Sequence, residues 1–356
     1  MLTQRIKRLS PYVPGEQPQD RTYIKLNTNE NPYPPTPEIR PFLKSFEIER
    51  LRLYPDPLFG TLREAISKRF NVGTSQVFVG NGSDEVLAFA FYAFFDSSRG
   101  KLLFPEFSYS FYPVYCDFYD IEYRKIPLNE NFAIEINNYL SEEASCGIVF
   151  PNPNAPTGIV LSLTKITELL ERYPEDRVIV IDEAYIDFGG ESAVSLINRF
   201  KNLLVIRTFS KSMSLAALRL GFAMGNEDLI SALFAVKDSF NSYPADLIAQ
   251  EIGEIAINDT DYYRSITQKI ILSRESLSKQ LQGLGWNVLP SGANFIFAGK
   301  KGVSGETVYR RLKEEGILVR YFNIKGIRNF VRITIGTDEE IETLLKSIRA
   351  LFEKVP

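Results

Sequence analysis

Five short apolar runs, separated by longer stretches, dominate the sequence between about residues 76 and 225. They read QVFVG, KLLFP, CGIVFPN, RVIVIDEAY and NLLVIRTFS. Strands with so few polar interruptions are typical of parallel sheets that are covered on both faces. Helical patterns such as DEVLAFAFYAFF and LTKITELLERY lie between several of them. The alternation predicts an α/β domain with a mostly parallel sheet.

The C-terminal part of the sequence follows a different pattern. SGANFIFAG, ILVRYF and FVRITIG read as strands, and GETVYRRLKEEG and DEEIETLLKSIRALFEKV as amphipathic helices. A length of 356 residues suits one large and one smaller domain. We therefore expect an N-terminal arm over residues 1–26 that is part of the small domain, a large domain over 27–245, and a small α+β domain over 246–356.

Two connecting segments are also expected. The Pro-rich stretch NTNENPYPPTPEIRP, residues 27–41, is predicted to be extended, without regular structure. The stretch from Ala245 to about Gln282 has a long helical pattern and is predicted to bridge the two domains.

The composition limits the possible binding partners and the cellular compartment of the protein. A net charge of −3 supplies no basic field for a phosphate backbone, so we expect no nucleic-acid partner. No run approaches the roughly 18 apolar residues that span a bilayer, and the N-terminus lacks the apolar stretch of a signal peptide. The two cysteines form no C-x-x-C pair and fit a reducing compartment. The sequence predicts a cytoplasmic protein that does not bind a membrane.

The sequence contains no histidine. Serine and cysteine triads of the usual kind and most zinc enzymes are thereby excluded, and no metal site is expected. Acid–base chemistry must then come from Lys, Tyr, Asp, Glu or a cofactor. A lysine held out of water becomes the leading candidate.

Polar residues follow two neighbouring strands of the predicted sheet. Asp182 ends the strand VIVID and Tyr185 comes shortly after it, while Lys211 follows the strand LLVIRTFS. In an open parallel sheet, ligands bind beyond the carboxyl ends of the strands. An acid, a phenol and an amine are therefore expected around one crevice, although Asp182 alone could be a turn or capping residue.

A small-residue turn follows the strand QVFVG. Gly82, Ser83 and Asp84 open a predicted helix and could offer backbone N–H groups to a phosphate. Simple capping of that helix is the alternative. The segment lacks the third glycine of a dinucleotide-binding motif, because Glu85 stands at that position.

IDEAYIDF and TFSKSMSLAALRLGF, whose Lys211 comes 29 residues after Asp182, resemble the core of the fold-type I pyridoxal-5′-phosphate (PLP) aminotransferases. NPNAPTG and GNGSDE belong to the same pattern, in the same order. LNTNENPYPP, RLYPDP, SYSFYPVY and FVRITIGT resemble the histidinol-phosphate aminotransferase subgroup. The resemblance covers nearly the whole chain, and it implies a large domain with a seven-stranded sheet flanked by helices, plus a smaller α+β domain.

The resemblance also implies a role for each cofactor residue. Lys211 would hold PLP covalently and move the substrate proton, Asp182 would pair with the ring nitrogen, and Tyr185 would donate a hydrogen bond to the ring oxygen O3′. Tyr109 would stack on the ring. The phosphate would be bound by Gly82, Ser83, Asp84, Thr208, Ser210 and Arg219. Core packing of Tyr109 and a surface position for Arg219 are the ordinary alternatives.

Asn154 and Tyr54 are two further candidate cofactor contacts. The family places an asparagine directly before Pro-Thr-Gly to bind O3′, whereas this chain has Ala155 there and Asn154 one position earlier. Asn154 is expected to substitute through a shifted turn, or else Tyr185 serves O3′ alone. Tyr54 resembles the tyrosine that reaches the PLP phosphate of the other subunit, which implies a homodimer with shared active sites.

The resemblance assigns the substrate contacts to Arg332, Arg320 and Tyr12. Arg332 would bind the carboxylate of glutamate and 2-oxoglutarate, a bidentate task that suits a guanidinium, and also the phosphate or hydroxyl end of histidinol phosphate. A structural salt bridge is the alternative for Arg332. The implied reaction is transamination between histidinol phosphate and 2-oxoglutarate. Aromatic amino-acid transamination, threonine-phosphate decarboxylation and a PLP-binding regulatory module are the alternatives.

Overall fold

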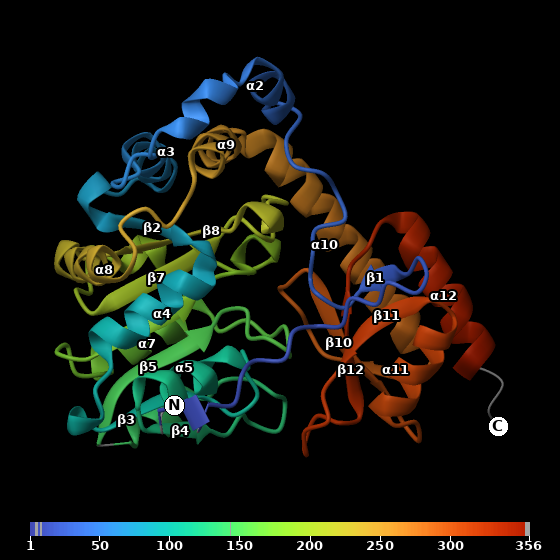
Figure 1. Ribbon diagram of the computed structural model, residues 1–356. Helices are drawn as coiled ribbons and strands as arrows, with labels where there is room; N and C mark the ends of the chain where they lie inside the picture. The colour runs from blue at the N-terminus through green and yellow to red at the C-terminus, as the bar shows by residue number, and fades with distance from the viewer. Residues whose placement is uncertain (4–5, 8, 143, 353–356) are drawn as a thin grey trace.

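The computed structural model describes residues 1–3, 6–7, 9–142 and 144–352. Parts of the predicted arm (4, 5 and 8), of the predicted large domain (143) and of the predicted small domain (353–356) lie outside the described residues. Within the described ranges, the strands form a seven-stranded sheet and a five-stranded sheet. Figure 1 shows the two sheets beside each other, with α10 (Thr260–Gly283) running from one towards the other.

The large sheet has the strand order β2-β8-β7-β6-β5-β3-β4. β8 pairs in antiparallel fashion with both β2 and β7, and the remaining pairs are parallel. The prediction of an α/β fold with a mostly parallel seven-stranded sheet is therefore confirmed. The strands are β2 (Val77–Asn81), β3 (Lys101–Pro105), β4 (Tyr123–Ile126), β5 (Ser145–Pro151), β6 (Val178–Asp182), β7 (Leu203–Thr208) and β8 (Leu220–Gly225).

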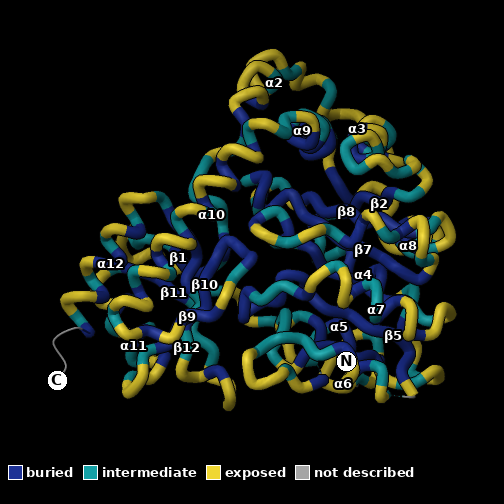
Figure 2. The backbone as a smooth tube through the Cα atoms, turned by 180° about the vertical axis from the view of Figure 1, so that it is seen from behind, coloured by how far each residue is buried: buried dark blue, intermediate teal, exposed yellow. Residues whose placement is uncertain are grey.

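Helices cover both faces of this sheet, which is why its central strands are apolar throughout. Successive residues point to opposite faces: Ile148 and Phe150 of β5 pack in one core cluster, and Val149 between them packs in another. The first cluster is closed by α3 (Gly60–Phe70), α6 (Ile136–Leu140), α7 (Leu163–Arg172) and α9 (Leu247–Asn258). The second is closed by α4 (Gly82–Phe94), α5 (Phe111–Tyr119) and α8 (Glu227–Phe240). Figure 2 shows the strands buried and the outer faces of the helices exposed.

The small sheet has the order β1-β11-β12-β10-β9. β1 comes from the end of the predicted N-terminal arm and pairs in parallel with β11, so that Ile24 lies opposite Ile317. Figure 1 shows the chain before β1 crossing from the side of α5 and β4 towards this sheet. Its strands are β1 (Ile24–Leu26), β9 (Trp286–Val288), β10 (Phe295–Lys300), β11 (Ile317–Tyr321) and β12 (Phe330–Thr334). Two helices, α11 (Gly305–Glu314) and α12 (Asp338–Phe352), follow β10 and β12 in the chain.

The connecting segments differ in detail from the sequence predictions. The Pro-rich stretch is irregular until α2 (Ile39–Ser45) begins inside it, since Pro41 lies in the first helical turn, where proline is tolerated. The long helical stretch is two helices, because Asp259 ends α9 and its side chain caps α10. The first part of α10, up to Ile266, packs in the large-sheet core, whereas Ile270 packs in the small-sheet core. α10 therefore contacts both cores, and the division between residues 245 and 246 stays a prediction.

The topology brings several chain segments to one edge of the large sheet. β2, β6 and β7 run in the same direction, so their carboxyl ends lie together, and the antiparallel β8 begins at this edge. The segments that follow Asn81, Asp182 and Thr208, and the residue that precedes Leu220, therefore meet there. None of the helices that the structure describes combines the length and the apolar composition that crossing a bilayer requires.

Candidate active site

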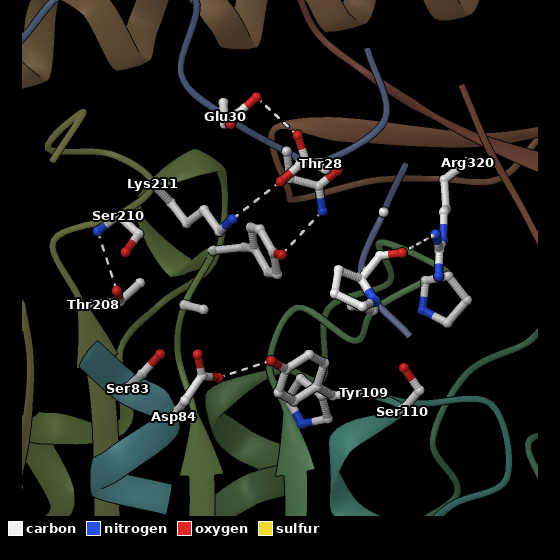
Figure 3. Close-up of a pocket in the computed structure, with 18 of the residues that line it drawn as sticks. Thr28, Glu30, Ser83, Asp84, Tyr109, Ser110, Thr208, Ser210, Lys211 and Arg320 are labelled. Carbon is white, nitrogen blue, oxygen red and sulfur yellow. Dashed lines mark hydrogen bonds between the residues drawn. The ribbon is translucent and has the colours of Figure 1, made fainter. Parts of the chain in front are cut away.

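A cavity of about 320 Å³ lies at this edge and is lined by residues of both sheets and of the N-terminal segment. Most of the predicted site residues line it. They are Tyr12, Ser83, Asp84, Tyr109, Asp182, Tyr185, Thr208, Ser210, Lys211, Arg219, Arg320 and Arg332. Figure 3 shows Ser83, Thr208 and Ser210 on one side of the cavity and Arg320 on the other, with Lys211 pointing in between them.

Lys211 enters the cavity from the loop that follows β7. Its Nζ donates to the carbonyl oxygen of Thr28 at 3.3 Å and lies 5.7 Å from the ring centroid of Tyr185. The Asn31 side chain donates to the backbone oxygen of Lys211 at 3.0 Å, which fixes this turn. No carboxylate of the described residues forms an ion pair with the amine. The amine is therefore positioned in the cavity without a neutralising partner.

Asp182 is buried at the carboxyl end of β6, where its Oδ1 accepts the Ala184 N–H at 3.1 Å. The Tyr112 hydroxyl donates to Oδ2 at a longer distance of 3.4 Å. Burial raises the pKa of Asp182 to about 6, against these two hydrogen bonds, which lower it. A carboxyl group buried in this way would be stabilised in its ionised form by a cation bound in the cavity.

Hydroxyl and N–H groups gather on one side of the cavity. Ser83 lies in the first turn of α4, whose N-terminus carries unsatisfied N–H groups and a partial positive charge. Thr208 and Ser210 lie at the end of β7, and the Ser210 N–H donates to Thr208 Oγ1 at 3.1 Å. These groups form a cup of donors that suits an anion such as a phosphate.

Arg219 completes the cup from the start of β8. Its guanidinium pairs with Asp84 Oδ2 at 3.0 Å, and the Tyr109 hydroxyl donates to Asp84 Oδ1 at 2.8 Å. Gly82 beside it has a φ of 81°, in the left-handed region that favours glycine, and a Cβ there would lie 2.6 Å from the guanidinium, which would have to move. Gly82 therefore shapes the cup without lining the cavity, and the Asp84 carboxylate holds Arg219 in addition to the predicted backbone role.

An aromatic cluster forms one wall. The ring of Tyr109 lies 6.4 Å from Tyr12 and 5.9 Å from Phe111, centroid to centroid, and Tyr112 meets it edge-on at 5.7 Å. Tyr12 comes from the N-terminal segment and also contacts Phe111 at 4.8 Å. A flat ring bound against Tyr109 would find apolar surface there.

Asn154 does not line the cavity, contrary to the prediction that it substitutes for the missing asparagine. Its side-chain amide donates to the Phe107 carbonyl at 2.9 Å and to Thr157 Oγ1 at 3.2 Å, which directs it away. The neighbouring Ala155 lines the cavity in its place and supplies only a methyl group.

Tyr54 also lies outside the cavity. Its ring stacks on Tyr243 at 4.6 Å, and the residue is 82% exposed. Its assignment to the active site of a partner subunit stays a prediction.

Two arginines face each other at the far side. Arg320 of β11 is the direct register partner of Arg332 of β12. The Arg332 guanidinium lies 5.3 Å from the ring centroid of Phe295 and donates to the Asn27 carbonyl at 3.1 Å, and its buried Nε finds no partner among the described residues. Neither arginine forms an ion pair with a described carboxylate. Burial lowers the pKa of Arg332, and the charge of Arg320 acts in the same direction.

Sequence reasoning missed most of the N-terminal part of the site. Asn27, Thr28, Asn29 and Glu30 all line the cavity. The motif LNTNENPYPP contains them, but the family resemblance gives them no individual roles. Three asparagines within five residues, in a segment that forms no element of its own, were the available signal.

Comparisons of sequence and fold with known proteins identify the family of this chain. The family description Aminotransferase class I and II matches residues 21–348. The chain belongs to the class I and II aminotransferases. A histidinol-phosphate aminotransferase of Syntrophus aciditrophicus is 58% identical over 99% of this chain and 98% of the relative, and one of Chromohalobacter salexigens is 50% identical over 97% of each. A crystal structure of histidinol-phosphate aminotransferase from Sinorhizobium meliloti in complex with PLP has the same fold, with a TM-score of 0.87 at 21% identity over 98% of each chain.

The class I and II aminotransferases use PLP, and the residues present fit that cofactor. The donor cup suits its phosphate, the buried carboxyl of Asp182 suits a cationic ring nitrogen, and the amine of Lys211 lies between these two points. The wall formed by Tyr109 suits its aromatic ring. The cavity therefore offers each chemical group of PLP a complementary partner.

Proposed function

We propose that this aminotransferase transfers the amino group of histidinol phosphate to 2-oxoglutarate, forming imidazole-acetol phosphate and glutamate. The observation that carries the proposal is the pair of arginines, Arg320 and Arg332, without an acidic partner among the described residues. The names of the two relatives that are 58% and 50% identical support it.

The arginine pair costs stability in the absence of a ligand. Like charges directly opposite each other on neighbouring strands repel, and burial of Arg332 adds a desolvation cost. A doubly charged phosphate offsets both costs, because each guanidinium can donate two hydrogen bonds to it. The same pair can bind the side-chain carboxylate of 2-oxoglutarate in the second half of the reaction. This explains how one site takes a phosphorylated donor and a dicarboxylate acceptor.

The positions of the side chains support the following roles for the other residues. PLP supplies an aldehyde that takes up the amino group and a ring that accepts electrons from the substrate. Lys211 would hold the cofactor and then move the proton at the substrate Cα. Asp182 would keep the ring nitrogen protonated, and Tyr185 would donate to O3′. Ser83, Asp84, Thr208, Ser210 and Arg219 would hold the phosphate, with Gly82 giving them room, and Tyr12 would close the substrate side.

Replacing Arg332 with glutamine tests the substrate assignment. We expect the kcat/KM for histidinol phosphate to fall about 10- to 100-fold, which corresponds to the loss of one charge-assisted hydrogen bond. The kcat/KM for histidinol, which lacks the phosphate, should change much less. Steady-state assays of both donors with 2-oxoglutarate measure the difference.

The same assays separate the alternatives. Efficient transamination of phenylalanine with no turnover of histidinol phosphate would contradict the proposed substrate, and so would release of carbon dioxide from threonine phosphate. A protein that binds PLP but turns over none of these compounds would indicate a regulatory module.

We also propose that the protein acts as a cytoplasmic homodimer. Large exposed apolar side chains gather near α2, α3 and the end of α8, and exposed apolar surface of this kind is typical of protein interfaces. They are Leu43, Ile48, Leu51, Leu53, Tyr54, Leu58 and Phe240. Two free, buried cysteines, Cys116 and Cys146, support a reducing compartment.

Hybrid dimers test whether Tyr54 completes the partner's site. Tyr54→Ala and Lys211→Ala homodimers should each have little activity at low PLP concentration. In a hybrid, one site retains Lys211 and receives an intact Tyr54, so an equal mixture should recover about a quarter of the wild-type activity. Unfolding and refolding the two variants together, followed by assay, measures the recovery. As a control, Lys211→Ala mixed with Asp182→Asn should recover nothing. Lys211 and Asp182 of one site both come from the same subunit, so each site of this hybrid contains one of the two changes.

A further inference from the structure

The hydroxyl of Tyr185 is the only predicted donor to O3′ that lines the cavity in the described structure. Ala155 stands where an asparagine amide would donate, and Asn154 is directed away from the cavity. The direction of one phenolic proton therefore decides whether O3′ receives a hydrogen bond.

One described side chain is hydrogen-bonded to this hydroxyl. Asn29 Nδ2 donates to the Tyr185 oxygen at 3.0 Å. The phenolic proton itself has no acceptor among the described residues. A hydroxyl that accepts from Asn29 on one side is left free to donate on the other, into the cavity.

The orientation of the Asn29 amide is fixed by Thr334 of β12. Thr334 Oγ1 accepts the backbone N–H of Asn29 at 3.0 Å, and its single proton goes to Asn29 Oδ1 at 3.1 Å. If the amide were turned over, the buried Thr334 proton would lose this acceptor. The oxygen of the amide therefore faces Thr334 and the N–H₂ group faces Tyr185.

The backbone of Asn29 is held equally well. Its carbonyl accepts from Asn294 Nδ2 at 3.0 Å, and the residue is 1% exposed. Its φ of 56° lies in the left-handed region, which asparagine tolerates better than most residues. Each hydrogen-bonding group of Asn29, in the backbone and in the side chain, has a partner, so the residue is a rigid support.

We propose that Asn29 is a positioning residue that orients the Tyr185 hydroxyl so that its proton is donated to O3′ of the cofactor. The inference rests on the proposed role of Tyr185. Asn29 thus connects Thr334 of the small sheet with the Tyr185 hydroxyl, which follows β6 of the large sheet. Asn29 acts on the cofactor only through Tyr185 and does not touch the reacting atoms.

Asn29→Asp tests this directly, because aspartate keeps the shape, the Oδ1 acceptor and the tolerance for the left-handed backbone, but replaces the donor with an acceptor. The Tyr185 proton should then turn towards the carboxylate. A hydrogen bond to O3′ stabilises the anionic, deprotonated form of the bound chromophore, so its loss should raise the pH midpoint of the visible absorbance change. We expect an upward shift of about one pH unit, the size that a single charge-assisted bond produces.

The absorbance titration is run on the PLP-loaded protein for the wild type, Asn29→Asp, Tyr185→Phe and the double variant. Tyr185→Phe should shift the midpoint upward, and Asn29→Asp should add little in that background. Asn29→Gly, which retains the left-handed backbone and removes the donor, should shift it in the same direction by less. Thr334→Ser, which keeps the hydroxyl of the network, should leave the midpoint at the wild-type value.

Three results would overturn the proposal. An unchanged midpoint in both folded Asn29 variants would show that Asn29 does not direct the proton. A shift of equal size in the Tyr185→Phe background would show that Asn29 acts by another route. If Tyr185→Phe itself left the midpoint unchanged, the proposal would fail together with the O3′ role of Tyr185, while the substrate assays of Arg332→Gln would still test the proposed reaction separately.

Discussion

Replacement of Lys211 with alanine is expected to abolish multiple-turnover transamination. Loss of a general acid–base group alone typically costs about 10²- to 10⁴-fold. Loss of the covalent attachment of PLP adds to this, so the total should exceed about 10⁴-fold. The sequence contains no histidine that could take over the proton. Steady-state assays with histidinol phosphate and 2-oxoglutarate, supported by the visible absorbance spectrum, measure both losses.

The structure gives a reason why the groups that contact the Lys211 amine should not rescue this variant. The Lys211 amine lies between the donor cup and the arginine pair, and its contacts are the Thr28 carbonyl and the face of Tyr185. Neither of these is a base near neutral pH. Lys165→Ala is a suitable control, since this lysine lies on α7 and bonds to Glu168 instead of lining the cavity. Near-normal turnover of a folded Lys211→Ala protein would contradict the proposed mechanism.

The central part of the site could be predicted from the sequence because topology makes it local. Asp182 and Lys211 each follow an apolar run, and parallel neighbouring strands place such ends at one edge of a sheet. Ser83 joins them for a different reason, because β2 runs parallel to β7 on the other side of the antiparallel β8. That strand order is not contained in the apolar runs themselves.

The other side of the cavity could not be predicted in this way. Asn29 and Tyr185 are 156 residues apart, and Asn29 and Thr334 are 305 apart. Their contact depends on how β1 joins the small sheet and on how that sheet packs against the large one, which no local pattern encodes. The opposition of Arg320 and Arg332 likewise depends on the register of β11 and β12, and a shift of one residue would turn one arginine to the other face.

The direction of the Asn154 side chain is a second feature that the sequence does not predict. Asn154 stands one position before the residue that precedes Pro-Thr-Gly, and its Nδ2 donates to Phe107 and Thr157 in the buried turn instead of to a group in the cavity. A buried amide that already has two acceptors gains little by turning towards a ligand. Residue type and spacing therefore do not predict the direction of this side chain.

Asp182→Asn is expected to separate activity from stability. Removing one partner of a buried ion pair typically costs 3–5 kcal/mol, so the rate with bound PLP should fall about 10²- to 10⁴-fold. The protein without cofactor should respond in the opposite way. Burial raises the pKa of Asp182 from the usual 3.8 to about 6, so the folded chain binds more protons than the unfolded chain between these values. The wild type therefore loses stability as the pH rises from about 4 to about 6.

An asparagine carries no charge to desolvate, and its Oδ1 can still accept the Ala184 N–H. Above pH 6 the cofactor-free variant should therefore melt at the same temperature as the wild type or higher, and its advantage should disappear below about pH 4. Glu168→Gln is a control for which the opposite sign is expected. Hydrogen bonds from Lys165 and Arg172 lower the pKa of this exposed carboxylate, so its replacement should not raise the melting temperature above pH 6. A fall in melting temperature above pH 6 with an unchanged rate would mean that Asp182 is a structural residue, and the strand-end acid would no longer have a role in the chemistry.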